Sequence, residues 1–157
     1  MAALTSGRIT PQQLTGFTKQ RVVIGVKASA TLQLGSIIMC DASNRAIAGA
    51  AVTGSVGVGV LQEQPGGLPG LPVVGSAVDR AVQIQVTPGV FAFDQDASIL
   101  QTTPYGTAIY AVDDHTVTLT ATGASQIGYL AQAPTLSTDP QIGAQVWVAI
   151  GIGATPQ

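Results

Sequence analysis

The chain has very little charge. Only 9% of its 157 residues are Asp, Glu, Lys or Arg, whereas charged residues make up about 25% of a typical globular domain. Six basic residues and a net charge of −2 do not supply the basic stripe on which nucleic-acid binding depends. Few groups are left that could titrate usefully in a reaction. The composition therefore argues against a nucleic-acid-binding protein and against an enzyme.

Cysteine and histidine each occur once. One cysteine cannot pair within the chain, which excludes a disulfide scaffold. Cys40 ends an apolar run, so we expect a buried, inert thiol rather than a nucleophile, which would need a base beside it. His115 follows Asp113 and Asp114, which could suggest a metal site. The tripeptide lies between two strand-like runs, however, and there it is typical of a turn.

Recognisable catalytic and cofactor motifs are also missing. Asp94 and Asp96 could begin a calcium loop, but the run of ligands stops at Ala97, so we predict a turn. The sequence has no phosphate-binding loop, no dinucleotide-binding glycine pattern and no nucleophile elbow. We therefore expect no catalytic residues, no bound metal and no cofactor.

Long hydrophobic runs do not occur either. Residues 1–10 lack the basic start and apolar run of a secretory signal. The longest candidate span, residues 46–62, contains four glycines, and a bilayer-spanning helix needs about 20 predominantly apolar residues. We expect no membrane span and a protein that is soluble and intracellular when made, with Cys40 reduced.

Short β-type runs fill the chain from Arg21 onward. With 46% hydrophobic residues the chain is too apolar to be disordered, and its length suits one domain with a real core. The runs alternate, as in Val82, Ile84 and Val86, and turn residues separate them, which is typical of an all-β sandwich or barrel. The runs are residues 21–27, 36–40, 56–60, 80–86, 90–93, 107–112, 116–120, 126–131 and 144–150.

The chain also repeats itself. Residues 34–39 align with residues 105–110 at an offset of 71, and at the same offset Gly57 falls on Gly128. A third match, of residues 81–84 with residues 145–148, needs an offset of 64. We interpret this as two similar β-meander halves that close into a single β-barrel or tulip-like barrel and so remove exposed edges. The alternative is that a chain rich in Gly and Val matches itself by chance.

Residues 1–20 differ in composition from the barrel domain predicted for residues 21–157. Thr10 and Pro11 are typical of a helix start, but Gly16 would end the helix after about one turn. We predict an extended N-terminal arm that docks onto a partner; the alternative is a frayed tail. The apolar side chains that would make this contact are Leu4, Ile9, Leu14 and Phe17.

A Pro/Gly-rich loop at residues 64–72 is incompatible with a helix or a central strand. Its apolar residues Leu68 and Leu71 either pack on a neighbouring subunit or the partner surface, or fold back onto their own barrel. Trp147 alternates with Val146 and Val148 in the last strand-like run. We expect Trp147 in the core, with an interface anchor as the alternative.

The order of the motifs resembles that of a known family. The chain is similar to the small capsid decoration (cement) proteins of tailed bacteriophages, which carry a Tyr-x-x-Asp-Asp-x-x-Val hairpin and a late Ile/Val-Gly strand. The resemblance covers residues 22–150, while the arm has no matching motif and the loop at 64–72 is longer. The motifs are Val26-Lys27-Ala28, Leu34-Gly35-Ser36-Ile37-Ile38, Gly57-Val58-Gly59-Val60, Val82-Gln83-Ile84-Gln85-Val86, Gly89-Val90-Phe91, residues 106–117 (GTAIYAVDDHTV), Ile127-Gly128-Tyr129 and Val146-Trp147-Val148.

The resemblance implies a structural virion protein on the outer capsid surface. Its partner would be the major capsid protein, and it would stabilise the expanded shell as trimers at local three-fold sites, without contacting nucleic acid or membrane. One alternative is an adhesive or carbohydrate-binding β-domain of the virion. Grouping of Tyr105, Tyr110 and Tyr129 on one surface would favour it. The other alternative is a head–tail connector or tail component.

Overall fold

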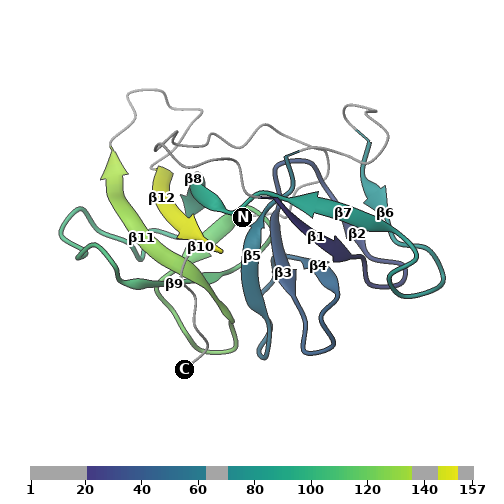
Figure 1. Ribbon diagram of the computed structural model, residues 1–157. Coiled ribbons are helices and arrows are strands. Elements are labelled where there is room, and N and C mark those ends of the chain that lie inside the picture. Colours follow the sequence, from purple (N-terminus) through teal and green to yellow (C-terminus); the bar gives the residue numbers. More distant parts are fainter. Residues whose placement is uncertain (1–20, 63–70, 136–144, 152–157) are drawn as a thin grey trace.

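The described part of the chain is built from short strands (Figure 1), as the sequence predicts. The computed structural model describes residues 21–62, 71–135 and 145–151, and these contain no helix, so no helix there could cross a membrane. The strands are β1 (Val22–Gly25), β2 (Thr31–Leu32), β3 (Ile37–Cys40), β4 (Ala46–Ala48), β5 (Val56–Val60), β6 (Val73–Val74), β7 (Gln83–Val86), β8 (Gly89–Gln95), β9 (Ala108–Ala111), β10 (Thr116–Thr118), β11 (Gln126–Thr135) and β12 (Gln145–Ile150).

Five strands of the second half, residues 88–151, form a closed barrel in the order β10-β8-β12-β11-β9. Alternation along each strand points one set of side chains inward, as in β12, where Val146, Val148 and Ile150 are fully buried. Phe91 and Phe93 from β8 fill the interior, with ring centroids 6.4 Å apart. The predicted all-β barrel is therefore present. It is closed by the second half alone, and not by the two halves together as the repeat had been interpreted.

The first half, residues 21–87, repeats the pairing scheme of the second. Its strands β4, β3 and β5 form one sheet, and β1 pairs with β7. Two isolated bridges join these pieces: a parallel bridge from Val26 to Ala46 and an antiparallel bridge from Val60 to Thr87. The resulting circuit, β4-β1-β7-β5-β3, matches the barrel of the second half strand for strand, including the parallel contact between β10 and β8. The internal repeat predicted from the sequence therefore extends to the topology.

A β-bulge recurs at the same place in both halves and corrects the alignment. Ile38 pairs with Gly59 before the register shifts, and Ile109 pairs with Gly128 before the equivalent shift. Gly59, and not Gly57, is thus the counterpart of Gly128. After the bulge, Val60 pairs with Thr87, and its counterpart Tyr129 pairs with Ala149. Thr87 therefore corresponds to Ala149, and Val86 corresponds to Val148. The sequence alignment had matched Ile84 to Val148.

The two equivalent glycines are required by the same close approach of strands. A Cβ atom at Gly59 would collide with the carbonyl oxygen of Thr87, and a Cβ atom at Gly128 would collide with the carbonyl oxygen of Ala149. Thr87 and Ala149 are themselves counterparts in the repeat. Both halves therefore use a glycine to bring the bulged strand against its neighbour.

The halves have separate cores that meet at β3. Ile38 belongs to the core of the first half together with Leu32, Ile84 and Val86. The outward-facing Ile37, Met39 and Val60 are fully buried and join the core of the second half. Strand β3 is consequently buried on both faces, which explains its uninterrupted apolar sequence.

Polar contacts also join the halves. The backbone N–H of Ile37 donates to the carbonyl oxygen of Asp114 at 2.7 Å. The Ser125 hydroxyl accepts from the N–H of Ser55 at 3.0 Å and donates to the carbonyl oxygen of Val52 at 2.6 Å. These bonds satisfy backbone groups that the packing of the halves removes from water.

The bulge glycine gives a direct test of the fold. We expect Gly128→Ala to lower the free energy of unfolding by more than about 3 kcal/mol, because the backbone of β12 must move. In the control Gly123→Ala, a Cβ meets nothing within 4 Å, so only the strain of a left-handed residue, about 1 kcal/mol, is expected. Urea unfolding followed by circular dichroism measures both, and equal losses would contradict this account of the bulge.

Candidate functional site

The Asp-Asp-His segment forms a turn between β9 and β10. One Asp113 carboxylate oxygen, Oδ1, accepts the backbone N–H groups of His115 at 3.0 Å and Thr116 at 2.8 Å. This is the local hydrogen bonding that makes Asp a favoured turn residue. The carbonyl oxygen of Asp114, in the same turn, receives the N–H of Ile37 from the first half. The sequence-based prediction of a turn is confirmed.

The His115 ring lies among three carboxylates. Its Nδ1 atom is 3.3 Å from an oxygen of Asp113 and 3.3 Å from an oxygen of Asp114, and its Nε2 atom is 3.6 Å from Asp94. Ligand atoms of Asp113, Asp114 and His115 lie within 4.8 Å of one another, which is close enough to hold a metal ion. The Asp113 oxygen already serves two backbone N–H groups, however, so the arrangement favours a structural turn over a metal centre.

The remaining chemical candidates of the sequence do not converge. Cys40 is partly buried rather than fully buried, and burial, assisted by the charge of Asp41, raises the pKa of its thiol. A raised pKa leaves little thiolate at neutral pH, in keeping with an inert cysteine. Asp96 accepts the N–H of Ser98 at 3.0 Å in a turn. Burial opposes ionisation of Asp96, but its hydrogen bonds outweigh burial and lower its pKa.

An ion-pair network centred on Arg45 lies in the first half. Arg45 bridges Asp41 at 2.8 Å and Asp79 at 2.6 Å, and Asp79 also accepts the N–H of Ala28 at 2.7 Å. The side-chain hydrogen bond from Arg45 lowers the pKa of Asp41, and the Ala28 N–H together with Arg45 lowers that of Asp79. The network ties the turn between β3 and β4 to the segment before β7.

This network predicts a defined pH dependence of stability. Because Asp41 and Asp79 have lowered pKa values in the folded protein, their contribution is present above their ordinary pKa of about 4 and is lost as the pH falls through the lowered values. In Arg45→Gln both pKa values return toward normal. We expect urea unfolding between neutral and acidic pH to show a smaller loss of stability for Arg45→Gln than for the wild type. Parallel pH profiles would contradict the assignment.

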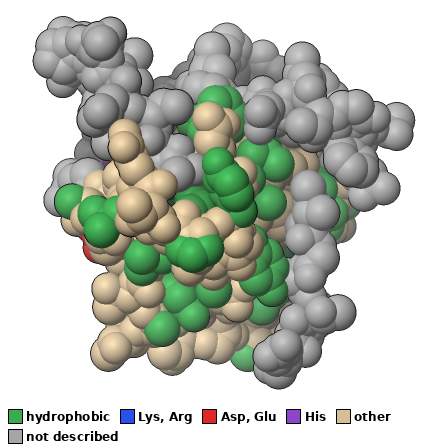
Figure 2. Space-filling model, turned by 90° about the vertical axis from the view of Figure 1, so that its left-hand side faces the viewer, with side chains coloured by type: hydrophobic (Ala, Val, Ile, Leu, Met, Phe, Trp, Pro, Cys, Tyr) green, Lys and Arg blue, Asp and Glu red, His purple; other side chains and the backbone are tan. Residues whose placement is uncertain are grey.

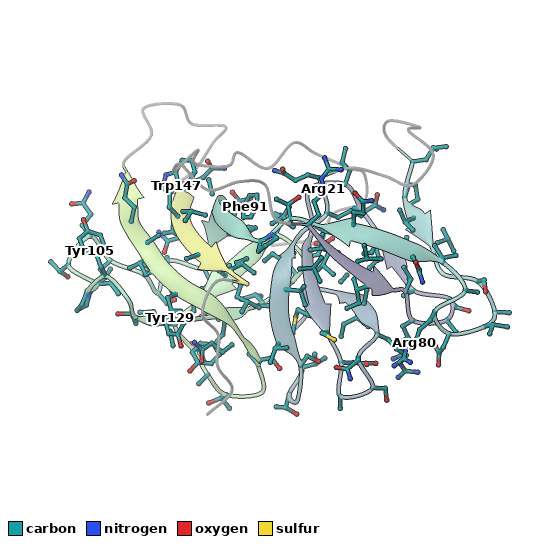
Figure 3. All side chains as sticks on the ribbon, in the orientation of Figure 1. Arg21, Arg80, Phe91, Tyr105, Tyr129 and Trp147 are labelled. Atoms are coloured by element: carbon teal, nitrogen blue, oxygen red, sulfur yellow. The ribbon has the colours of Figure 1, made fainter. Side chains whose placement is uncertain are left out.

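Aromatic side chains with polar tips line the outer wall of the second-half barrel (Figure 3). Tyr129 pairs across the strands with Ala108 and with Ala149, and Ala149 pairs with Val90. Because Ile109 and Ala111 face the interior, Tyr110 on the same strand faces outward with Ala108. These side chains are partly exposed, so a band of neutral side chains crosses the wall from β8 to β9.

Trp147 belongs to this outer wall and not to the core. Val146 and Val148 on either side of it are fully buried in the barrel, whereas Trp147 is partly buried on the opposite face of β12 and pairs with Ala92. The expectation of a core tryptophan is therefore wrong. The alternation around it carried the correct signal, because two inward valines put the residue between them on the outer face.

Large exposed hydrophobic side chains occur on both halves. Tyr105, just before β9, is 72% exposed and Leu100 is 61% exposed. Leu71, just before β6, is 59% exposed, and Val74, within β6, is 56% exposed. Leu71 is thus not folded onto its own barrel. The other residues proposed for partner contact, Leu4, Ile9, Leu14, Phe17 and Leu68, lie outside the described residues.

Comparison with protein-family models, with curated proteins and with solved structures finds no match for this chain.

Proposed function

We propose that the protein is a structural virion component that binds the outer surface of the phage capsid and stabilises the expanded shell. It would act as a decoration, or cement, protein on the major capsid protein, as trimers at local three-fold sites. The observation that carries this proposal is the surface: apolar side chains such as Leu71, Val74 and Tyr105 are exposed on both halves, and charge is scarce. The motif resemblance to phage decoration proteins supports the same function.

Neutral, apolar contacts suit this task physically. Contacts between exposed charges weaken as salt screens them, whereas apolar and backbone contacts do not depend on charge. A decoration protein also repeats each contact over many identical sites, so modest contacts add through multivalency. Asp96 and Asp113 accept backbone N–H groups in turns, and Asp41 and Asp79 pair with Arg45, which supports binding as the role of the surface.

Binding to shells tests the proposal. We expect the purified protein to co-sediment with expanded empty phage shells at multiples of three copies per three-fold site.

Variants test which parts of the chain make the contact. Deleting residues 1–16 should leave the strands folded and abolish binding. Leu68→Ser combined with Leu71→Ser should weaken binding or trimerisation. Val23→Ser serves as the matched control, since Val23 is 60% exposed, like Leu71 at 59%.

The outcomes separate the alternatives. Failure of the wild-type protein to bind shells would overturn the proposal. A ring of six or twelve copies would favour a head–tail connector. Full binding by the truncated protein would remove the arm from the account while leaving shell binding in place.

An adhesive, carbohydrate-binding role is the second candidate, and one observation favours it. Tyr110 and Tyr129 share the outer face of β9 and β11, and the exposed Tyr105 lies immediately before β9. Aromatic faces with polar tips suit neutral saccharides, which offer C–H groups for stacking and hydroxyls for hydrogen bonds. This role predicts binding to a glycan array that Tyr129→Ala reduces at least about tenfold. The absence of any bound glycan would exclude it.

A further inference from the structure

The internal repeat shows how the outer face of a half can be covered. In the first half the outer face of β3 and β5 carries Ile37, Met39 and Val60, with Ile37 and Val60 directly paired. All three side chains are fully buried, and all three belong to the core of the second half. The outer face of β3 and β5 is therefore a packed contact between the two repeats of one chain.

The equivalent face of the second half lacks such a cover among the described residues. By the shared bulge, Ile37, Met39 and Val60 correspond to Ala108, Tyr110 and Tyr129, and Ala108 and Tyr129 are again directly paired. These three residues are partly exposed. Figure 2 shows the end of the molecule that this half forms: hydrophobic side chains are spread over it and no Lys or Arg side chain is visible.

The part of the first half that corresponds to this covering surface of the second half is partly exposed. The second half covers β3 and β5 with the turn between β9 and β10 and with the segment leading into β11. The corresponding parts of the first half are the turn between β3 and β4 and the segment leading into β5. Ser43 and Asn44 in that turn are exposed, and Val52 and Val56 in that segment are 38% and 47% exposed.

The two halves carry opposite charge. No Lys or Arg follows Arg80 in the sequence, whereas five aspartates lie beyond it. Between residues 21 and 87, four basic residues outnumber three acidic ones. The first half of one molecule and the second half of another would therefore attract each other, while two second halves would repel. The basic residues are Arg21, Lys27, Arg45 and Arg80, and the aspartates are Asp94, Asp96, Asp113, Asp114 and Asp139.

We propose that the outer face of β9 and β11 binds the first half of a second copy of this chain. The contact repeats between molecules the packing that joins the halves within one molecule. Such a contact is heterologous, since it joins two different surfaces, and it closes into a ring when the rotation between units allows closure. A closed trimer would then contain six halves.

This inference deepens the proposed function by naming the contact between copies, and it can be tested without shells. Light scattering coupled to size exclusion measures the mass of the full-length protein over a range of concentrations. We expect self-association that weakens at high salt. Tyr110→Lys and Tyr129→Lys should each raise the dissociation constant at least about tenfold, because each would bury a positive charge in an apolar contact with a half that is itself net positive.

Controls keep the result interpretable. Val23→Lys introduces the same charge at an exposed strand position outside the face, and it should associate like the wild type. Circular dichroism should show that all three variants stay folded, since the substituted positions are at least partly exposed. A monomeric wild type, or tyrosine variants that associate as well as the wild type, would overturn the inference. Neither a monomeric wild type nor unaffected tyrosine variants would exclude shell binding, so this test is independent of the proposed function.

Cross-linking tests the heterologous geometry. In a Cys40→Ser background, proteins carrying Tyr110→Cys or Val56→Cys each hold one thiol. A short bismaleimide should join them when they are mixed and leave each one alone uncross-linked. Cross-linking of the Tyr110→Cys protein with itself would show a two-fold contact and would overturn the arrangement, as would failure to cross-link in the mixture.

Discussion

The rest of the structure depends on the burial of β3 on both faces. Its residue Ile38 packs in the core of the first half, while Ile37 and Met39 on the other face of the strand pack in the core of the second half. One strand of four residues thereby joins two similar units. Without the second half, three apolar side chains of the first half, counting Val60, would face water. Burial of such side chains is worth about 1.5–3 kcal/mol each, so the halves stabilise each other.

The repeat also explains the difference between the two faces of the molecule. Both units have the same kind of outer face, but among the described residues only the first half's copy of that face is buried against the other unit. The sequence reflects this: the covered positions carry Ile37, Met39 and Val60, whereas their uncovered counterparts include Tyr110 and Tyr129, whose rings combine an apolar body with a polar tip. The low charge that first argued against an enzyme suits a surface of this kind.

Much of this was readable from the sequence, and the failures have specific causes. Alternating β-branched runs predicted an all-β barrel, and the match of residues 34–39 with residues 105–110 identified the repeat. The alignment kept one offset of 71 and missed a difference in length. Ile47 and Gly57, the two partners of Met39, are ten residues apart, whereas Thr118 and Gln126, the two partners of Tyr110, are eight residues apart, so Gly57 was matched in place of Gly59. The burial of Ile37 by a unit distant in sequence had no local signal. The outward position of Trp147 did have a local signal, because the valines on either side of it face inward.

Electron cryomicroscopy of expanded empty phage shells incubated with the purified protein tests the central claim most directly. The account predicts added density on the outer surface at local three-fold axes, with each trimer resolved into six similar lobes, two for every chain. Shells that show no added density would contradict the proposed function. Density confined to the portal vertex would contradict it as well and would favour a connector.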